Sequence, residues 1–459
     1  MERRKFIKLS LALGSYILAP QFSYASPLDL GKINFSAAIE TSNAAQTLII
    51  YLYGGASQLA GNLTNLEEIK TVSQSNYDNY FNTLTQTTNN LWKEAGGDAM
   101  ESLLSSGDMT LFRCCYSQVR EEVGNKAHAV CTAQNQKGSF DEDSAGIIAN
   151  LTNILSANNS INTSSVMPFV TMEGESTFYR DGHIPVPGYL KPIGLNESFD
   201  NPYDRDNVRQ WYYYTEAERD RAPENYWKPD NQGGFLPALT TSMDTLAQQH
   251  NSTGKIKDIF TQRDARSQFI NTIKTSTTPD LGSDAYPQDN KFAQQIEGAI
   301  KLLTHNADTK ILTISTGRLG GWDDHNEAQN YVNRTQDLFL SLKSAMAHIR
   351  AEGKENSINI MVFGEFGRNV NLNSANGWDH GNLQNLYVLG GHGYFNHQGI
   401  VGETILENTG RVNRLYMKPK PGTYQFEPFS IAATLYKIYG IENPEELTGG
   451  YGPIDRLFV

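Results

Sequence analysis

The chain has 459 residues, with 38 lysines and arginines against 50 aspartates and glutamates, and a formal net charge of −12. This acidic balance argues against nucleic acid or an anionic membrane surface as the main partner, since both repel a negatively charged protein. Charged residues make up 19% and aromatic residues 10% of the chain, which is typical of a globular protein and not of a disordered one.

The first 25 residues have the pattern of an export signal. A basic start precedes the apolar stretch Leu9 to Ala19, and Ser23 to Ala25 (SYA) provides a small-x-small cleavage site. The apolar run is too short to span a bilayer. Arg3 to Lys8 (RRKFIK) resembles the twin-arginine signal. We therefore expect residues 1–25 to be removed by an export route that leaves the mature protein, residues 26–459, periplasmic or extracellular and without a transmembrane segment.

The first half of the mature chain predicts strands and helices in turn. Thr47 to Tyr53 (TLIIYLY) is a continuous apolar and β-branched run, typical of a buried strand, and it ends at the turn-forming residues Gly54 to Ser57. The elements expected after it are a helix near Leu91 to Leu104, a strand at Met109 to Tyr116, a helix at Asp143 to Asn158 capped by Asp143 or Ser144, and a strand at Val166 to Met172 that Pro168 would place at a sheet edge.

Residues 173–234 break this pattern. Tyrosines and tryptophans, Trp211 and Tyr212 among them, lie between aspartate, asparagine, proline and glycine. A long irregular stretch of this kind is typical of a functional insertion or lid. Its aromatic side chains either bind a polymer such as a carbohydrate or pack the insertion onto the main domain, and the second interpretation has the greater weight.

The second half predicts a regular alternation. Helices are expected from Pro237 to Asn306 with a break at Thr277 to Asp289, then strands at Ile311 to Ser315, Ile358 to Phe363 and Gln384 to Leu389, with helices at Asn333 to Arg350 and Pro428 to Tyr439. Alternation of this kind indicates an α/β domain with a doubly wound, mostly parallel sheet and helices on both faces.

The chain has three cysteines, Cys114, Cys115 and Cys131. In an oxidising compartment Cys131 could bridge to one of the vicinal pair. Three buried thiols that act as small hydrophobic side chains are an equally good interpretation. No spacing of cysteine or histidine predicts a structural zinc site.

Three short clusters combine carboxylates with imidazoles: Gly320 to His325 (GGWDDH), Gly364 to Arg368 (GEFGR) and Asp379 to Gly381 (DHG). The first two follow predicted strands, and ligands of open α/β sheets bind beyond the carboxyl ends of the strands. A mixed shell of carboxylate and imidazole suits zinc, manganese or iron better than calcium. The three clusters together therefore favour one shared divalent metal site.

Each cluster also has a simpler interpretation. Asp323 and His325 are two residues apart and point to the same side in extended backbone, so they can reach one ion, but an aspartate here can also cap a helix. Glu365 serves as metal ligand or general base, or it pairs with Arg368. Arg368 would otherwise anchor the anionic group of a substrate ester, since guanidinium binds phosphate and sulfate bidentately.

Taken together, the twin-arginine start and the runs LIIYLYGGAS, GGWDDH, GEFGRN and GWDHG resemble the DUF1501 family of exported bacterial proteins, which is related to the alkaline phosphatase and sulfatase superfamily. The resemblance extends from about Leu48 to the end of the chain. It implies an alkaline phosphatase-like fold in which five residues line the metal centre: Asp323, His325, Glu365, Asp379 and His380. It also makes His128 a residue of the pocket and of the catalytic set, with Glu365 and Arg368.

The chain departs from the family pattern at two points. Ser57 stands where the family has a metal-binding aspartate after Gly-Gly, and Ala127 stands where the family has a serine next to the histidine. Phe366 also occupies the place of a second-metal histidine. Ser57, Thr132 or a water molecule would then have to serve as nucleophile.

Two hypotheses follow. The first is an exported metal-dependent hydrolase of phosphate or sulfate esters. The second is a catalytically degenerate relative that binds or assembles an extracellular polymer or surface structure through the aromatic insertion. The retained clusters favour the first, whereas Ser57 and Ala127 favour the second.

Overall fold

The computed structural model describes residues 28–458 apart from 37–44, 74–76, 78–83, 175, 200–244, 246–254, 327 and 409–414. The predicted signal peptide and most of the aromatic insertion, with Trp211 and Tyr212, lie outside the described residues. None of the described helices is both long and apolar enough to cross a membrane.

An eight-stranded sheet forms the centre of the protein, in the order β4-β3-β5-β1-β6-β7-β2-β8. Neighbouring strands pair in parallel except where β7 meets β6 and β2, so β7 alone runs against the other strands. The strands are β1 (Gln46–Leu52), β2 (Met109–Cys115), β3 (Phe169–Thr171), β4 (Ile193–Gly194), β5 (Ile311–Ser315), β6 (Ile358–Gly364), β7 (Gln384–Gly390) and β8 (Gly399–Val401), and a separate antiparallel pair joins β9 (Thr404–Asn408) to β10 (Leu415–Pro419).

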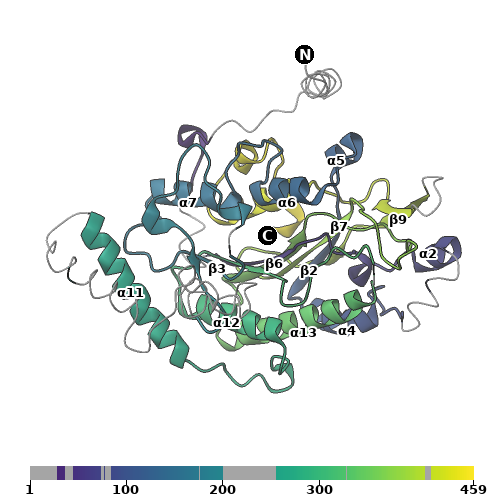
Figure 1. Cartoon of the computed structure of the whole chain (residues 1–459), viewed down its shortest axis with the longest axis horizontal. Helices are drawn as coiled ribbons and strands as arrows, with labels where there is room; N and C mark the ends of the chain where they lie inside the picture. Colours follow the sequence, from purple (N-terminus) through teal and green to yellow (C-terminus); the bar gives the residue numbers. More distant parts are fainter. Residues whose placement is uncertain are drawn as a thin grey trace, which may run out of the picture.

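Helices cover both faces of this sheet (Figure 1). Those of eight or more residues are α2 (Leu66–Ser73), α4 (Gly97–Ser105), α6 (His128–Lys137), α7 (Ile147–Ala157), α11 (Lys255–Thr275), α12 (Lys291–His305), α13 (Asn330–Ala351) and α14 (Phe429–Ile438), and α5 (Gln118–Val123) is shorter. Helices α4, α12 and α13 lie on one face, and α6 and α7 lie on the other. The predicted α/β class, with a mostly parallel sheet between two helical layers, is confirmed.

Strand β1 shows why the sequence produces two cores. Successive side chains of a strand point to opposite faces of the sheet. Leu48 and Ile50 accordingly join the core under α4, α12 and α13, whereas Ile49 and Tyr51 join the core under α7 and α14. All seven residues of β1 are buried, as the continuous apolar run predicted.

The structure differs from the predictions at α2, at the start of α7 and in the place of β3 in the sheet. Helix α2 lies in the polar segment after Gln58, for which no helix was expected. Helix α7 begins at Ile147 with Gly146 at its N-cap, not Asp143 or Ser144. A Cβ at residue 146 would lie 2.0 Å from the carbonyl oxygen of Thr177, so close packing against the neighbouring turn decides this position. Strand β3 is next to last in the sheet, with only the two-residue β4 outside it.

Candidate metal centre

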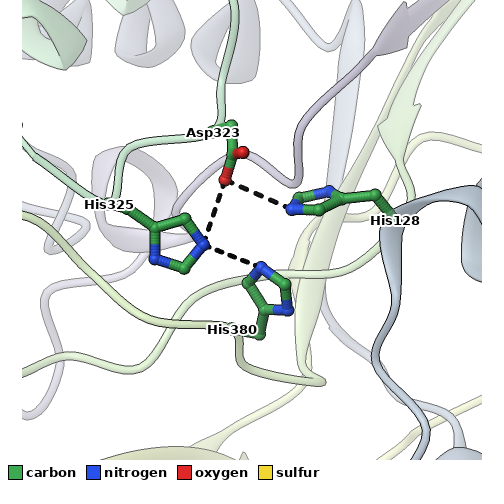
Figure 2. A group of neighbouring side chains, drawn as sticks. All are labelled: His128, Asp323, His325 and His380. Carbon is green, nitrogen blue, oxygen red and sulfur yellow. Dashed lines mark hydrogen bonds and ion pairs between the residues drawn. The ribbon is translucent and has the colours of Figure 1, made fainter.

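Four side chains converge beyond the carboxyl ends of β1, β5 and β6. His128 is the first residue of α6, Asp323 and His325 lie in the loop after β5, and His380 lies in the loop before β7. One side-chain nitrogen or oxygen from each residue lies within 4.8 Å of the other three, and Figure 2 shows the four groups pointing toward one another. The predicted loops therefore meet, and α6 adds His128 from a distant part of the sequence.

The inward atoms are three imidazole nitrogens and one carboxylate oxygen. His325 Nε2 lies 2.9 Å from His380 Nε2. Asp323 Oδ1 lies 3.2 Å from the Nε2 atoms of both His128 and His325. The Nε2 atom of His128 is buried and makes no hydrogen bond, so its one polar contact is the 3.2 Å approach to Asp323 Oδ1.

The outward nitrogens of all three histidines face acceptors. His128 Nδ1 lies 2.9 Å from Glu365 Oε2, and His380 Nδ1 lies 2.7 Å from the carbonyl oxygen of Lys126. His325 Nδ1 lies 3.3 Å from Asp379 Oδ1. A carbonyl or an ionised carboxylate can only accept, so these contacts favour a proton on each Nδ1, while Asp323 Oδ1 is a second acceptor that faces the Nε2 atoms of His128 and His325. In the neutral imidazole that carries its proton on Nδ1, Nε2 presents a lone pair to the interior of the group.

Lone pairs that face one another repel unless a cation lies between them or a ring carries a second proton. Burial, with the charges of Arg368, His128 and His325, lowers the pKa of His380 to about 4, so a doubly protonated His380 is unfavourable near neutral pH. Inward lone pairs, outward Nδ1–H donors and an adjacent carboxylate are the arrangement by which proteins hold a metal ion. The donor set therefore fits the divalent ion that the sequence predicted.

Arg368 ties the ligand loops together. Its Nη2 donates to Asp323 Oδ1 at 2.7 Å, and its side chain is fully covered. Burial alone would raise the pKa of Asp323, but the hydrogen bond and charge of Arg368, with the two neighbouring histidines, lower it below its usual value. Asp323 is thus held as a carboxylate, which is the form that binds a cation.

Glycines allow the loops to approach closely. Gly54 has a φ of +105°, and a Cβ there would lie 2.5 Å from the backbone nitrogen of Asp323. A Cβ on Gly377 would lie 2.0 Å from the carbonyl carbon of His325. The Gly54-Gly55 turn that the sequence indicated therefore serves both the left-handed backbone of the turn and the close contact between the β1 and β5 loops.

The other expected site residues have different places. Glu365 and Asp379 lie behind His128 and His325 and are not among the four converging groups. Ser57 is buried, accepts a hydrogen bond from the Leu59 N–H and lines a separate small cavity. Thr132 lies one turn after His128 on α6, and so on the same side of that helix.

Phe366 lies against two of the converging histidines, and the three cysteines form no disulfide. The ring of Phe366 packs against His128 and His380, with centroid distances of 5.0 and 4.7 Å. All three cysteines are buried and free. Sequence reasoning missed the carbonyl oxygen of Lys126, because a backbone acceptor carries no residue-type signal.

Comparison with solved structures finds similar arrangements at low identity. The alkaline phosphatase from the Antarctic bacterium TAB5 is 12% identical, with 87% of this chain and 99% of that chain covered at a TM-score of 0.35. The lipoteichoic acid synthase LtaP from Listeria monocytogenes is 8% identical, with 92% and 79% covered at a TM-score of 0.34. Ps i-CgsB, solved in complex with k-i-k-neocarrahexaose, is 8% identical, with 89% and 75% covered at a TM-score of 0.39.

At these TM-scores the likenesses do not decide the activity of this chain. No curated protein sequence matches it. A family model does match, over residues 45–405, and its description is "Protein of unknown function (DUF1501)". That range contains the strands of the central sheet, the helices of both layers apart from α14, and all four converging side chains. The chain belongs to the DUF1501 family.

Proposed function

We propose that this protein is an exported metal-dependent hydrolase that acts on phosphate or sulfate esters. The observation that carries the proposal is the set of three histidines whose Nδ1 atoms face acceptors while their Nε2 atoms converge with Asp323. An exposed acidic cluster arises easily without a ligand. Three imidazoles that have acceptors behind their Nδ1 atoms and bring their Nε2 atoms together beside a carboxylate are the arrangement that a bound cation explains.

The residues that would hold the ion are His128, Asp323, His325 and His380. Three nitrogen donors and one carboxylate suit the zinc, manganese and iron class of divalent ions. A divalent ion bound there supplies Lewis acidity toward the oxygen of an ester. We assign Glu365 and Asp379 to fixing the rings of His128 and His325, and not to direct ligation.

The chain's own groups prepare the site for such chemistry. Asp323 is half exposed, so the group opens toward a substrate on this side. Phe366 forms an apolar wall against His128 and His380, which excludes water from one side of the group. Glu365 is 2% exposed, so it acts through His128 and is not positioned to contact a substrate.

Metal analysis tests the first step. The full protein, purified without chelators, is expected to carry a zinc, manganese or iron ion by elemental analysis, and Asp323→Ala and His380→Ala are expected to lose it. His183→Ala is the matched control, because His183 is an exposed histidine outside the four-residue group. Wild-type protein without any stoichiometric transition metal, and unable to take one up, would refute the proposal.

Ester hydrolysis tests the second step. Metal-loaded protein is expected to cleave at least one of p-nitrophenyl phosphate, bis(p-nitrophenyl) phosphate and p-nitrophenyl sulfate. A chelator should abolish the activity and added metal should restore it. Turnover that His380→Ala retains in full would assign the activity to a contaminant or to another site.

Export is a separate part of the proposal. The run Arg3 to Lys8 supports it. The double substitution Arg3→Lys with Arg4→Lys is expected to leave the protein inside the cell, as measured by fractionation with the unchanged signal as control. Equal export of both forms would contradict the twin-arginine route.

A further inference from the structure

The most unusual group at the candidate centre is the guanidinium of Arg368. It is a full positive charge with no exposed side-chain surface, and it lies directly beside the converging ligands. Nη2 lies 2.7 Å from Asp323 Oδ1, and Nη1 lies 3.4 Å from His325 Nε2. An arginine in this position would ordinarily be assigned to binding the anionic part of a substrate.

The hydrogen bonds of Arg368 argue against that assignment. Nε donates to the carbonyl oxygen of Gly55 at 2.7 Å, and Nη1 donates to that of Trp378 at 3.0 Å. Nη2 donates to Trp322 at 3.2 Å and also to Gly54. Backbone carbonyls and Asp323 therefore engage all three nitrogens of the guanidinium, and a substrate anion could bind it only after breaking these contacts.

The same four carbonyls form an oxygen cage around a cation. They come from three loops, after β1, after β5 and before His380, and Asp323 completes the cage with a carboxylate oxygen. Several carbonyls with one carboxylate are the donor set that hard cations such as Ca²⁺ prefer. Arg368 thus supplies, as a covalently attached positive charge, the cation that these oxygens surround.

Two-ion centres need two donor sets with the ions about 3.5–4 Å apart. Among the described residues, one group of histidine, cysteine and acidic side chains has that convergence, and it comprises His128, Asp323, His325 and His380. On one side of this group lies the Arg368 guanidinium, and the ring of Phe366 packs against two of its histidines. Neither neighbour offers a donor to a second ion.

We infer that the guanidinium of Arg368 occupies the position of a second cation, so that the centre holds one divalent ion per chain and Arg368 is a positioning residue for Asp323. This inference rests on the proposed function, since it takes Asp323 as a metal ligand. It also removes the direct anion anchor, so a substrate anion has to be bound by other groups.

The stoichiometry of the wild-type protein is the first test. Equilibrium dialysis against Zn²⁺ or Mn²⁺, followed by elemental analysis, is expected to reach one ion per chain, and bound Mn²⁺ should give the electron paramagnetic resonance spectrum of an isolated ion. Two ions per chain, or a spin-coupled pair, would overturn the inference while leaving metal binding intact. No bound ion would instead refute the proposed function itself.

Substitution of Arg368 is the second test. Arg368→Ala empties the oxygen cage and is expected to raise the count from one ion to two when Ca²⁺ is supplied with Zn²⁺. Arg368→Lys keeps a positive charge in the cage and is expected to stay at one. A folded Arg368→Ala protein that still binds one ion would contradict the inference, and if this variant does not fold, the wild-type stoichiometry still decides.

Discussion

Replacing Glu365 by glutamine tests whether the groups behind the histidines set the affinity for metal. Glu365 Oε2 lies 2.9 Å from His128 Nδ1, and its Oε1 accepts from the N–H of Gly54. A carboxylate can accept on both sides, but an amide has one oxygen and one NH₂ group. If the amide oxygen of the glutamine still accepts the hydrogen bond from the N–H of Gly54, the amide NH₂ group faces His128 Nδ1. This contact favours the tautomer of His128 that carries the proton on Nε2, and the inward lone pair is then lost.

The structure sets the expected size of the effect. Loss of a hydrogen-bonding partner behind a metal-binding histidine typically costs about 10–100-fold in metal affinity, which is about 1.4–2.8 kcal/mol. Glu365 is 2% exposed, so water cannot replace it and the upper part of that range is expected. The side chain of Asp379 is 44% exposed and lies 3.3 Å from His325 Nδ1, so Asp379→Asn is the matched variant and should cost at most about 10-fold.

Competition with a fluorescent chelator for Zn²⁺ measures both affinities, and ¹⁵N resonance of the imidazoles reports the tautomer of His128. The expected order of affinity is wild type, then Asp379→Asn, then Glu365→Gln. The reasoning fails if Glu365→Gln binds as tightly as the wild type, or if Asp379→Asn loses more affinity than Glu365→Gln does.

Three further predictions concern stability and backbone geometry. Burial raises the pKa of Glu173 from 4.5 to about 7, so the folded state prefers the protonated acid. Its contribution should be fully present below about pH 4.5 and decline by about 3 kcal/mol as pH rises to 7, and chemical denaturation of Glu173→Gln should lack this decline. On α13, Leu342→Ala should cost about 2–5 kcal/mol because Leu342 is fully buried, whereas Leu340→Ala, at a site 38% exposed, should change the free energy of unfolding by about 0.5 kcal/mol or less. Gly54→Ala should weaken metal binding because its Cβ meets the Asp323 loop, whereas Gly107→Ala, also at positive φ but with nothing within 4 Å, should affect stability alone.

Much of the fold was predictable because its signals are local. The runs that become β1, β5 and β6 are apolar and end at glycine or small polar residues, and each strand was placed within one or two residues of its true bounds. The reversed direction of β7 was not predicted, since a strand's direction depends on the neighbour with which it pairs. Helix α2 was missed because its polar segment has only a narrow apolar stripe.

At the site, the sequence identified residue types but not their roles. Asp323, His325 and His380 were expected to converge, and the structure brings them together with His128. Glu365 and Asp379 were expected to bind the ion, yet in the fold their carboxylates face the far side of two histidine rings. A carboxylate next to an imidazole in sequence can bind in front of it or behind it, and only the path of the loop decides which.

By itself, the sequence determined the α/β class, the edge of the sheet where carboxylates and imidazoles gather and the kind of side-chain atoms available there. The class follows from the periodicity of apolar residues, and the kind of side-chain atoms follows from residue type. Both can be determined from a few neighbouring positions. Only the tertiary structure decided that one nitrogen of His128, on α6, faces Asp323 and that Arg368 is fully covered, with its nitrogens bonded to backbone carbonyls and to Asp323. The physical reason is that the burial and the hydrogen-bond partners of a residue depend on loops that lie hundreds of residues apart in the sequence. The contact between Arg368 and Gly54 is one example, and no local sequence pattern predicts it.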